Sequence, residues 1–486
     1  MLTGVPLLPF ASFATPCTST RTQAAPQEKA PLRVRRATDP SGAKTGPELL
    51  DLLEGYSYRV VQRAGETMSD GYIAQRLPDG MACMQLSNGN LAVMRNHEVD
   101  TASGYWLGTR PPENLCYDAR YGGGVSRLVF DPTGQQLLSS NLVLAGTARN
   151  CSSGPSPFGY LTCEETTAAN HGFVFLCDPE ADTLQPPQRI SAYGRFRHEA
   201  AVVDPETHIA YLTEDQPDSA FYRFVPDAKD RPFIGRLQAL AVRGLPGHDT
   251  AQARRGTRYD VTWVDIANPT PTDDSVRLQA FAAGAARIVR GEGIWLHDGH
   301  VYFSATAGGP LARGQIFALN IAAQVLTVIA ASENPETLDM PDNLTASADG
   351  LLIIAEDGHE GNFIRYLDAI GTPLPLARNR ISLGEFAGPC FTPDGNTLFI
   401  NMQTDGLTLA ITGPFAELAR KNRRDAGLTE DSSSIDIDAG VARNTADPPH
   451  QESWGFSPTI IGTTTGLSLL ALAALSYRNR YRKPDR

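Results

Sequence analysis

A repeated hairpin pattern constrains the fold of this chain more than any other feature. Two short apolar runs are joined by a Gly, Asn or Asp turn, and acidic side chains stand at the outer ends of the runs. For example, Glu199 precedes the run AAVV, and the following run, IAYL, leads to Glu214 and Asp215. Such runs, without long helical periodicity, predict an all-β protein of antiparallel hairpins.

The pattern occurs about six times, with roughly 60 residues in each unit, close to the size of a propeller blade. We therefore expect a six-bladed β-propeller with loop insertions. In an antiparallel hairpin, the start of the first strand and the end of the second lie at the same edge of the sheet. Acidic residues at these two places should gather on one face, where crowded carboxylates repel one another unless cations neutralise them. The simpler alternative is that Asp and Glu merely punctuate strand ends.

The two ends of the chain depart from this pattern. Residues 1–49 read as a leader and tether, with an apolar run ending in a small-x-Ala site at Ser12–Ala14, although no basic residue precedes it. Residues 50–416 would form the propeller, and 417–457 a polar linker. In the hydrophobic C-terminal segment, 458–486, residues 458–477 are long enough to span a bilayer before a basic end. Four hydroxyl residues weaken that span, so a cleavable sorting tail or a peripheral helix is the alternative.

Charge and cysteine content narrow the class of function. The formal net charge of −12 argues against general binding to nucleic acid. The seven cysteines lack CxxC pairs, so their spacing does not suggest a tetrahedral zinc module. If the protein is exported, a disulfide among Cys83, Cys116, Cys163, Cys177 and Cys390 is an open alternative to buried thiols.

Several sequence blocks resemble those of the PhoX-type alkaline phosphatases, in that family's order. The blocks are RNHE at 95–98, NCSSGPSPFGYLTCEE at 150–165, GRFRHE at 194–199, RGEG at 290–293, PDN at 341–343 and FTPDGNTLFINMQ at 391–403. The resemblance covers about residues 58–415. It implies a six-bladed propeller whose channel holds ferric and calcium ions and hydrolyses phosphate monoesters outside the cytoplasm.

The resemblance also implies the residues of the site. The metal ligands would be Glu98, Cys151, Glu164, Glu165, Glu199, Glu214, Glu292, Asp342 and Asp357. Carboxylate oxygens suit Ca²⁺ and Fe³⁺, and one thiolate would tune the iron. His97 and His198 are expected to orient the neighbouring glutamates rather than to bind metal.

The resemblance further implies that Arg290 and Glu292 are catalytic. Arg290 matches the arginine that contacts phosphate in the family, and a guanidinium suits two phosphoryl oxygens. Thr166 takes the place of an asparagine that contacts phosphate in the family, and no clear lysine follows the turn at 356–358. These two departures make metal binding a firmer expectation than efficient hydrolysis.

The leading hypothesis is an exported phosphomonoesterase, periplasmic or extracellular, that acts as a monomer on small phosphorylated substrates and does not bind nucleic acid. A calcium-dependent lactonase-like propeller and a non-catalytic, calcium-stabilised binding propeller are the alternatives. A single-metal lactonase would not need Cys151 beside so many acids. The sequence has no Ser-His-Asp elbow, phosphate-binding glycine loop or dinucleotide fingerprint.

Overall fold

The computed structural model describes residues 35–36, 48–100 and 106–428. The expected cleavage site at 12–14, the segment 458–477 and the end of the expected linker lie outside these residues. Within the described part of the chain, no helix is long and apolar enough to cross a membrane.

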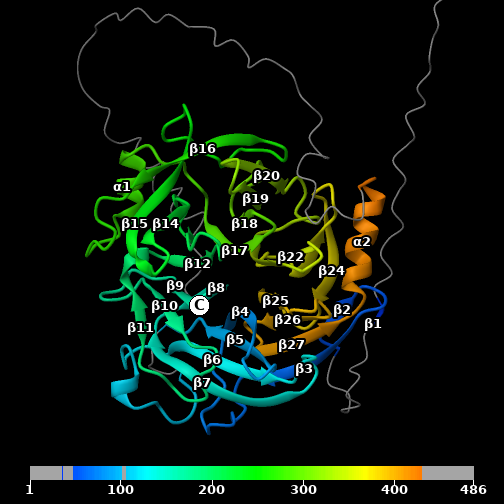
Figure 1. Ribbon diagram of the computed structural model, residues 1–486. Helices are drawn as coiled ribbons and strands as arrows, with labels where there is room; N and C mark the ends of the chain where they lie inside the picture. The colour runs from blue at the N-terminus through cyan, green and yellow to red at the C-terminus, as the bar shows by residue number, and fades with distance from the viewer. Residues whose placement is uncertain (1–34, 37–47, 101–105, 429–486) are drawn as a thin grey trace, which may run out of the picture. The chain divides into compact units, whose positions relative to one another are not determined.

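In the described residues, twenty-seven strands form five antiparallel sheets, arranged like the blades of a propeller (Figure 1). The first sheet consists of β4 (Pro78–Gln85), β5 (Leu91–His97), β6 (Gly123–Phe130) and β7 (Leu137–Thr147). The second consists of β8 (Asn150–Ser156), β9 (Gly159–Glu164), β10 (Val174–Cys177) and β11 (Gln188–Ile190). A third contains β25 (Phe386–Phe391), β26 (Thr397–Met402), β27 (Leu407–Thr412) and β3 (Ser57–Arg63).

The other two sheets are larger. One joins β21 (Pro341–Ala346), β22 (Leu352–Glu356), β23 (Phe363–Leu367) and β24 (Pro373–Asn379) to β2 (Leu50–Leu52) and β1 (Arg35–Arg36). The nine-stranded sheet begins with β12 (His198–Val203), β13 (Ala210–Glu214), β14 (Tyr222–Ala228) and β15 (Arg231–Val242). It continues through β16 (Arg258–Asp265) to β20 (Val325–Ala331), β19 (Gln315–Asn320), β18 (His300–Ala305) and β17 (Gly291–His297).

Six strands form the inner ring of this arrangement: β4, β8, β12, β17, β21 and β25. Each contacts the next in chain order, and β25 contacts β4 (Figure 1). The expected all-β, propeller-like fold is therefore confirmed. Because β16 bonds to both β15 and β20, the hydrogen bonds define five sheets, and the count of six blades stays a prediction.

The hydrophobic core lies between neighbouring sheets. Met94 of the first sheet packs in one cluster with Tyr160 and Phe175 of the second, and Val93 packs with Phe399 on the other side. Strand β5 is buried along its whole length, because a sheet covered on both faces needs apolar residues on both. This double burial explains the continuous apolar runs of the sequence.

The expected domain boundary at residue 416 falls inside a helix. Helix α2 (Phe415–Asp425) buries Phe415 and Ala419 in the core beside β2 and β27, so the folded body extends past the expected start of the linker. The other helices are α1 (Val276–Ala282) and the short 3₁₀ turns at Glu113–Leu115 and Ser191–Tyr193. All six cysteines of the described residues are free thiols, so the disulfide alternative finds no pair among them.

Candidate metal centre

Each inner strand has a register shift at the same place, near its first residue. The shifts lie between residues 78 and 81, 150 and 153, 198 and 201, 291 and 294, 341 and 344, and 387 and 390. At each shift, two residues of the inner strand oppose one residue of the next strand, as in a β-bulge, which bends the strand and redirects a side chain. The first residues inside the six bulges are Asp79, Cys151, Glu199, Glu292, Asp342 and Gly388.

The second residue of the bulge has little room. A Cβ atom added to Gly80 would lie 2.5 Å from the Cα of Ser152, and one added to Gly293 would lie 2.5 Å from the Cα of Asn343. Neighbouring inner strands thus approach each other closely at the bulges. This approach brings the preceding side chains, Asp79 and Glu292 among them, close to those of the adjacent strand.

A second set of side chains follows the second strand of each unit. The residues are Glu98, Glu165, Asp215, Thr306, Asp357 and Gln403. Each donates its backbone N–H to the carbonyl of the residue that precedes an inner strand, over 2.9–3.2 Å. These hydrogen bonds hold the second set at the same end of the hairpins as the bulges, as the hairpin argument predicts.

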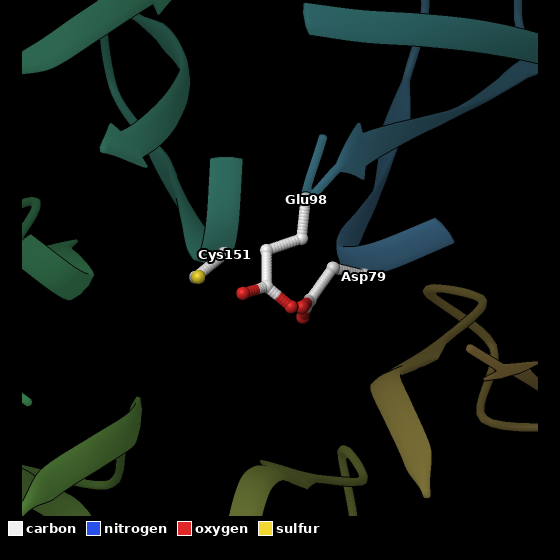
Figure 2. A group of neighbouring side chains, drawn as sticks. All are labelled: Asp79, Glu98 and Cys151. Carbon is white, nitrogen blue, oxygen red and sulfur yellow. The ribbon is translucent and has the colours of Figure 1, made fainter. Parts of the chain in front are cut away.

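The two sets, together with Glu385 just before β25, contain eight carboxylates and one thiol that could hold metal ions, in four overlapping groups. In each group the ligand atoms lie within 4.8 Å of one another: Asp79, Glu98 and Cys151; Cys151, Glu165 and Glu199; Glu199, Glu292 and Asp342; Asp342, Asp357 and Glu385. Figure 2 shows the first group, in which the carboxylate of Glu98 lies between that of Asp79 and the sulfur of Cys151. Shared members make the four groups one continuous arc.

The electrostatics of the arc favour bound cations. Burial raises the pKa of Glu199 well above its ordinary value, and the neighbouring charges of Glu292, Asp342 and Glu165 raise it further. Burial also raises the pKa of the Cys151 thiol, and the negative charges of Glu199 and Glu98 raise that pKa further. Neighbouring cations would relieve this repulsion, so the donor set, carboxylates with one thiol, fits a site for metal ions.

Two arginines bind carboxylates of the arc. Arg290 donates from Nε and Nη2 to both oxygens of Asp215, at 2.7 and 2.8 Å, and from Nη2 to Glu292 at 2.6 Å. Arg149 donates from Nη2 to Glu98 at 2.6 Å and also to Glu165. Burial alone would lower the pKa of Arg290, but the charges of Asp215 and Glu292 outweigh it and raise that pKa.

The structure brings together seven of the nine expected ligands: Glu98, Cys151, Glu165, Glu199, Glu292, Asp342 and Asp357. Glu164 and Glu214 lie outside these groups. Glu164 is fully buried and accepts hydrogen bonds from His171 and from three backbone N–H groups. Glu214 accepts from Tyr222, and burial raises its pKa to about 8.

The remaining expected residues also have partners of their own. The hydroxyl oxygen of Thr166 accepts a hydrogen bond from the backbone N–H of Ala168. His97 bonds to the carbonyl of Arg76 and to Ser126, and His198 bonds to the carbonyl of Gly194. Neither ring bonds to the adjacent glutamate, which corrects the expectation that these histidines orient Glu98 and Glu199.

Sequence reasoning left Asp79 and Glu385 out of the ligand set. The motif Pro78-Asp79-Gly80 begins its strand just as Pro341-Asp342-Asn343 does, and this likeness could have identified Asp79. Glu385 immediately precedes β25, where the hairpin pattern already places acids. Arg149 was also missed, and its position before β8, equivalent to that of Arg290 before β17, was the available signal.

Comparisons with known proteins agree with this geometry. Residues 132–406, more than half of the chain, match the family described as alkaline phosphatase PhoX. Among curated proteins, none has a significant sequence match to the chain. The structure of Pseudomonas fluorescens PhoX in complex with vanadate, a transition-state analogue, is similar with a TM-score of 0.61 and 18% identity, covering 79% of this chain and 98% of that one.

Two other solved structures are more distant. A gluconolactonase from Xanthomonas campestris has a TM-score of 0.42 and 12% identity, covering 79% of this chain and 96% of that one. A streptogramin B lyase has a TM-score of 0.38 and 11% identity, covering 74% and 98%. The match over residues 132–406 decides the assignment: the chain belongs to the PhoX family of alkaline phosphatases, which are hydrolases of phosphoric monoesters.

Proposed function

We propose that this chain hydrolyses phosphate monoesters at a centre of several metal ions in the propeller channel. The observation that carries the proposal is the continuous arc of eight carboxylates and one thiol, each within 4.8 Å of two others. The contacts around the inner ring support six blades, in which the nine-stranded sheet counts as two blades joined by β16.

The residues divide by the ions that they suit. Asp342, Asp357 and Glu385 form an all-carboxylate group, whose hard oxygen donors suit Ca²⁺. Cys151 belongs to two groups, and its softer sulfur suits Fe³⁺ together with carboxylates such as Glu165 and Glu199. When bound, these ions would polarise the phosphoryl group and lower the pKa of a water molecule.

Arg290 would stabilise the phosphoryl group as negative charge develops on it. Its Nε and Nη2 are engaged by Asp215 and Glu292, which fix the plane of the guanidinium. The two N–H groups of Nη1 then remain for phosphoryl oxygens. Glu292 holds Arg290 and also belongs to a metal group, so it would couple the arginine to the ions.

We further propose that the protein is exported and acts on small phosphorylated substrates as a monomer. The leader-like residues 1–16 and the calcium-type ligands support export, because free Ca²⁺ is abundant outside the cytoplasm. A calcium-dependent lactonase is the alternative, supported by the all-carboxylate group and disfavoured by Cys151 in the arc.

One experiment tests both the chemistry and the ions. The purified protein is assayed with p-nitrophenyl phosphate and with gluconolactone in the presence of Ca²⁺, and its metal content is measured by mass spectrometry. We expect phosphate ester hydrolysis, with iron and calcium bound. Lactone turnover with calcium alone would establish the alternative.

Cys151→Ala makes the test specific to the thiolate. We expect loss of both iron and activity in a folded protein, because a methyl group supplies neither charge nor a donor atom. Cys390→Ala is the matched control, since Cys390 is buried in the apolar core between β4 and β26 and should lose only about 1 kcal/mol of stability. Iron content and turnover of wild-type level in Cys151→Ala would overturn the thiolate assignment.

A further inference from the structure

Three arginines occupy the same position in three successive units of the ring. Arg149, Arg197 and Arg290 immediately precede β8, β12 and β17. Their carbonyls accept the backbone N–H of Glu165, Asp215 and Thr306, respectively. The corresponding residues before the other inner strands are Leu77, Met340 and Glu385. At this position of the ring, arginines therefore occupy three successive units and are absent from the other three.

Arg197 differs from its two equivalents in how its side chain is held. Carboxylates bind Arg149 and Arg290 through hydrogen bonds, whereas Arg197 forms a looser ion pair, in which Oε1 of Glu165 lies 3.8 Å from its Nη1. The Nε of Arg197 is buried and has no hydrogen-bond partner among the described residues. The guanidinium of Arg197 is thus drawn towards the acidic arc without being neutralised by a direct hydrogen bond.

Arg197 is also the arginine that solvent reaches most easily. Its side chain is 41% exposed, compared with 28% for Arg149 and 10% for Arg290. A molecule that arrives from solvent would therefore reach the side chain of Arg197 more easily than that of Arg290. A guanidinium with unused N–H groups offers a planar pair of donors that matches two oxygens of a phosphoryl group.

The negative charge of the metal groups opposes the approach of an anionic substrate, so a guanidinium beside them would favour its binding. The metal groups hold eight carboxylates, and an anion approaching over Glu385 or Asp342 would meet the negative charge of these side chains. An approach over Arg197 passes between two further arginines. Clefts lined by one sign of charge guide ligands of the opposite sign. The side of the ring that carries the three arginines is therefore the favourable approach for a phosphate dianion.

We propose that Arg197 binds the phosphoryl group of the incoming ester and selects for a dianionic phosphate. The proposal rests on the proposed function and deepens it, since it assigns substrate recognition to a residue that is not a member of any metal group. Arg290, which is buried beside Glu292, would act at the metal groups, and the more exposed Arg197 would contact the ester as it arrives. Arg149, held by Glu98 and Glu165, would keep those two carboxylates in place.

The test compares Arg197→Gln and Arg197→Lys with the wild-type holoenzyme. For Arg197→Gln we expect KM for p-nitrophenyl phosphate to rise about 10- to 100-fold, which is the loss of one charge-assisted hydrogen-bonding group, with kcat changed less than about threefold. Arg197→Lys should restore part of the affinity. The inhibition constant of inorganic phosphate should rise in parallel with KM, while the metal content stays unchanged.

Binding of inorganic phosphate, measured by titration calorimetry on the metal-loaded protein, gives a readout that does not depend on turnover. Arg236→Gln is the matched control, because Arg236 is exposed on β15 and should leave KM and phosphate affinity as in the wild type.

The outcomes separate the two proposals. If the wild type hydrolyses esters but Arg197→Gln keeps its KM and phosphate affinity, Arg197 has no role in binding and only this inference fails. A fall in kcat at constant KM would also overturn it. If the wild type lacks phosphatase activity, yet phosphate binds and weakens in Arg197→Gln, the proposed function fails and the anion site stands. Absence of phosphate binding in the wild type would overturn the anion site.

Discussion

Adjacent carboxylates at the end of β9 lie in different surroundings. The carboxylate of Glu164 is buried and accepts hydrogen bonds from His171 and from the backbone N–H groups of Ala148, Gly172 and Phe173. Glu165 belongs to a metal group with Cys151 and Glu199. Because successive side chains of a strand point to opposite faces, one acid of the pair serves the fold and the other serves the centre.

A pair of isosteric substitutions tests this division. We expect Glu165→Gln to lower metal content and activity with little loss of stability, since it removes one negative charge from a crowded group. Glu164→Gln should instead destabilise the protein by about 2 kcal/mol, because a buried carboxylate with four hydrogen bonds is replaced by an amide that cannot accept them all. Metal content and urea denaturation of both variants check the assignment. Equal metal loss in the two would contradict it.

The sequence alone could not show which of two adjacent acids belongs to the metal centre. It places acids at the strand end, but the face that each one occupies depends on where the last ladder pair falls, and a shift of one residue exchanges the two faces. In β9 the last pair joins Glu164 to Asn150, so Glu165 is the first residue beyond the ladder. The same register puts Glu214 opposite His198, and Asp215 outside the sheet beside Arg290.

At the scale of strands, the β-bulge of each inner strand positions the side chains of the metal centre. It places Asp79, Cys151, Glu199, Glu292 and Asp342 at equivalent points of five inner strands. The hairpin pattern of the sequence predicted which end of each strand would carry acids. It did not predict the bulges, since one extra residue beside a short apolar run looks like ordinary loop sequence.

The bulge glycines offer a test of how close packing positions the ligands. A Cβ added to Gly293 would lie 2.5 Å from the Cα of Asn343 and 2.9 Å from the carbonyl oxygen of Asp342, so the clash is with backbone. We expect Gly293→Ala to push β17 and β21 apart, to destabilise the protein by about 1–3 kcal/mol and to weaken metal binding, because Glu292 and Asp342 share a group.

The matched control for that prediction lies two residues away. A Cβ on Gly291 would have its nearest neighbour at 3.4 Å, an ordinary contact, so Gly291→Ala should change stability by less than about 1 kcal/mol and leave the metal content intact. Thermal melting and metal analysis distinguish the two variants. If Gly293→Ala behaved like Gly291→Ala, close strand approach would not be what positions the ligands.

At the scale of the whole molecule, the ring is closed by strands from opposite ends of the described chain. Strand β3 pairs with β27 from Leu407 opposite Arg63 to Thr412 opposite Ser57. Local sequence patterns predicted the hairpins and their number. They carry no information on the pairing of two strands that lie more than 300 residues apart in the chain. The same limit hid the continuation of β15 through β16 into β20, which merges two of the expected units.

Metal removal should reveal how much this closed ring depends on its centre. The eight carboxylates come from strand ends distributed around the ring, so ions bound between them connect neighbouring units, and their loss leaves repelling charges inside. A ligand present at 100 times its dissociation constant stabilises the folded state by about 2.7 kcal/mol. We therefore expect excess EDTA to lower the melting temperature by several degrees, and Ca²⁺ in excess of the chelator to restore most of it.

Asp342→Asn removes one charge shared by two groups, so it should reduce the change in melting temperature on chelation. Asp394→Asn, in the turn between β25 and β26, should leave that change as in the wild type. A melting temperature unaffected by EDTA in a protein shown to lose its metal would mean that the ions serve catalysis without supporting the ring.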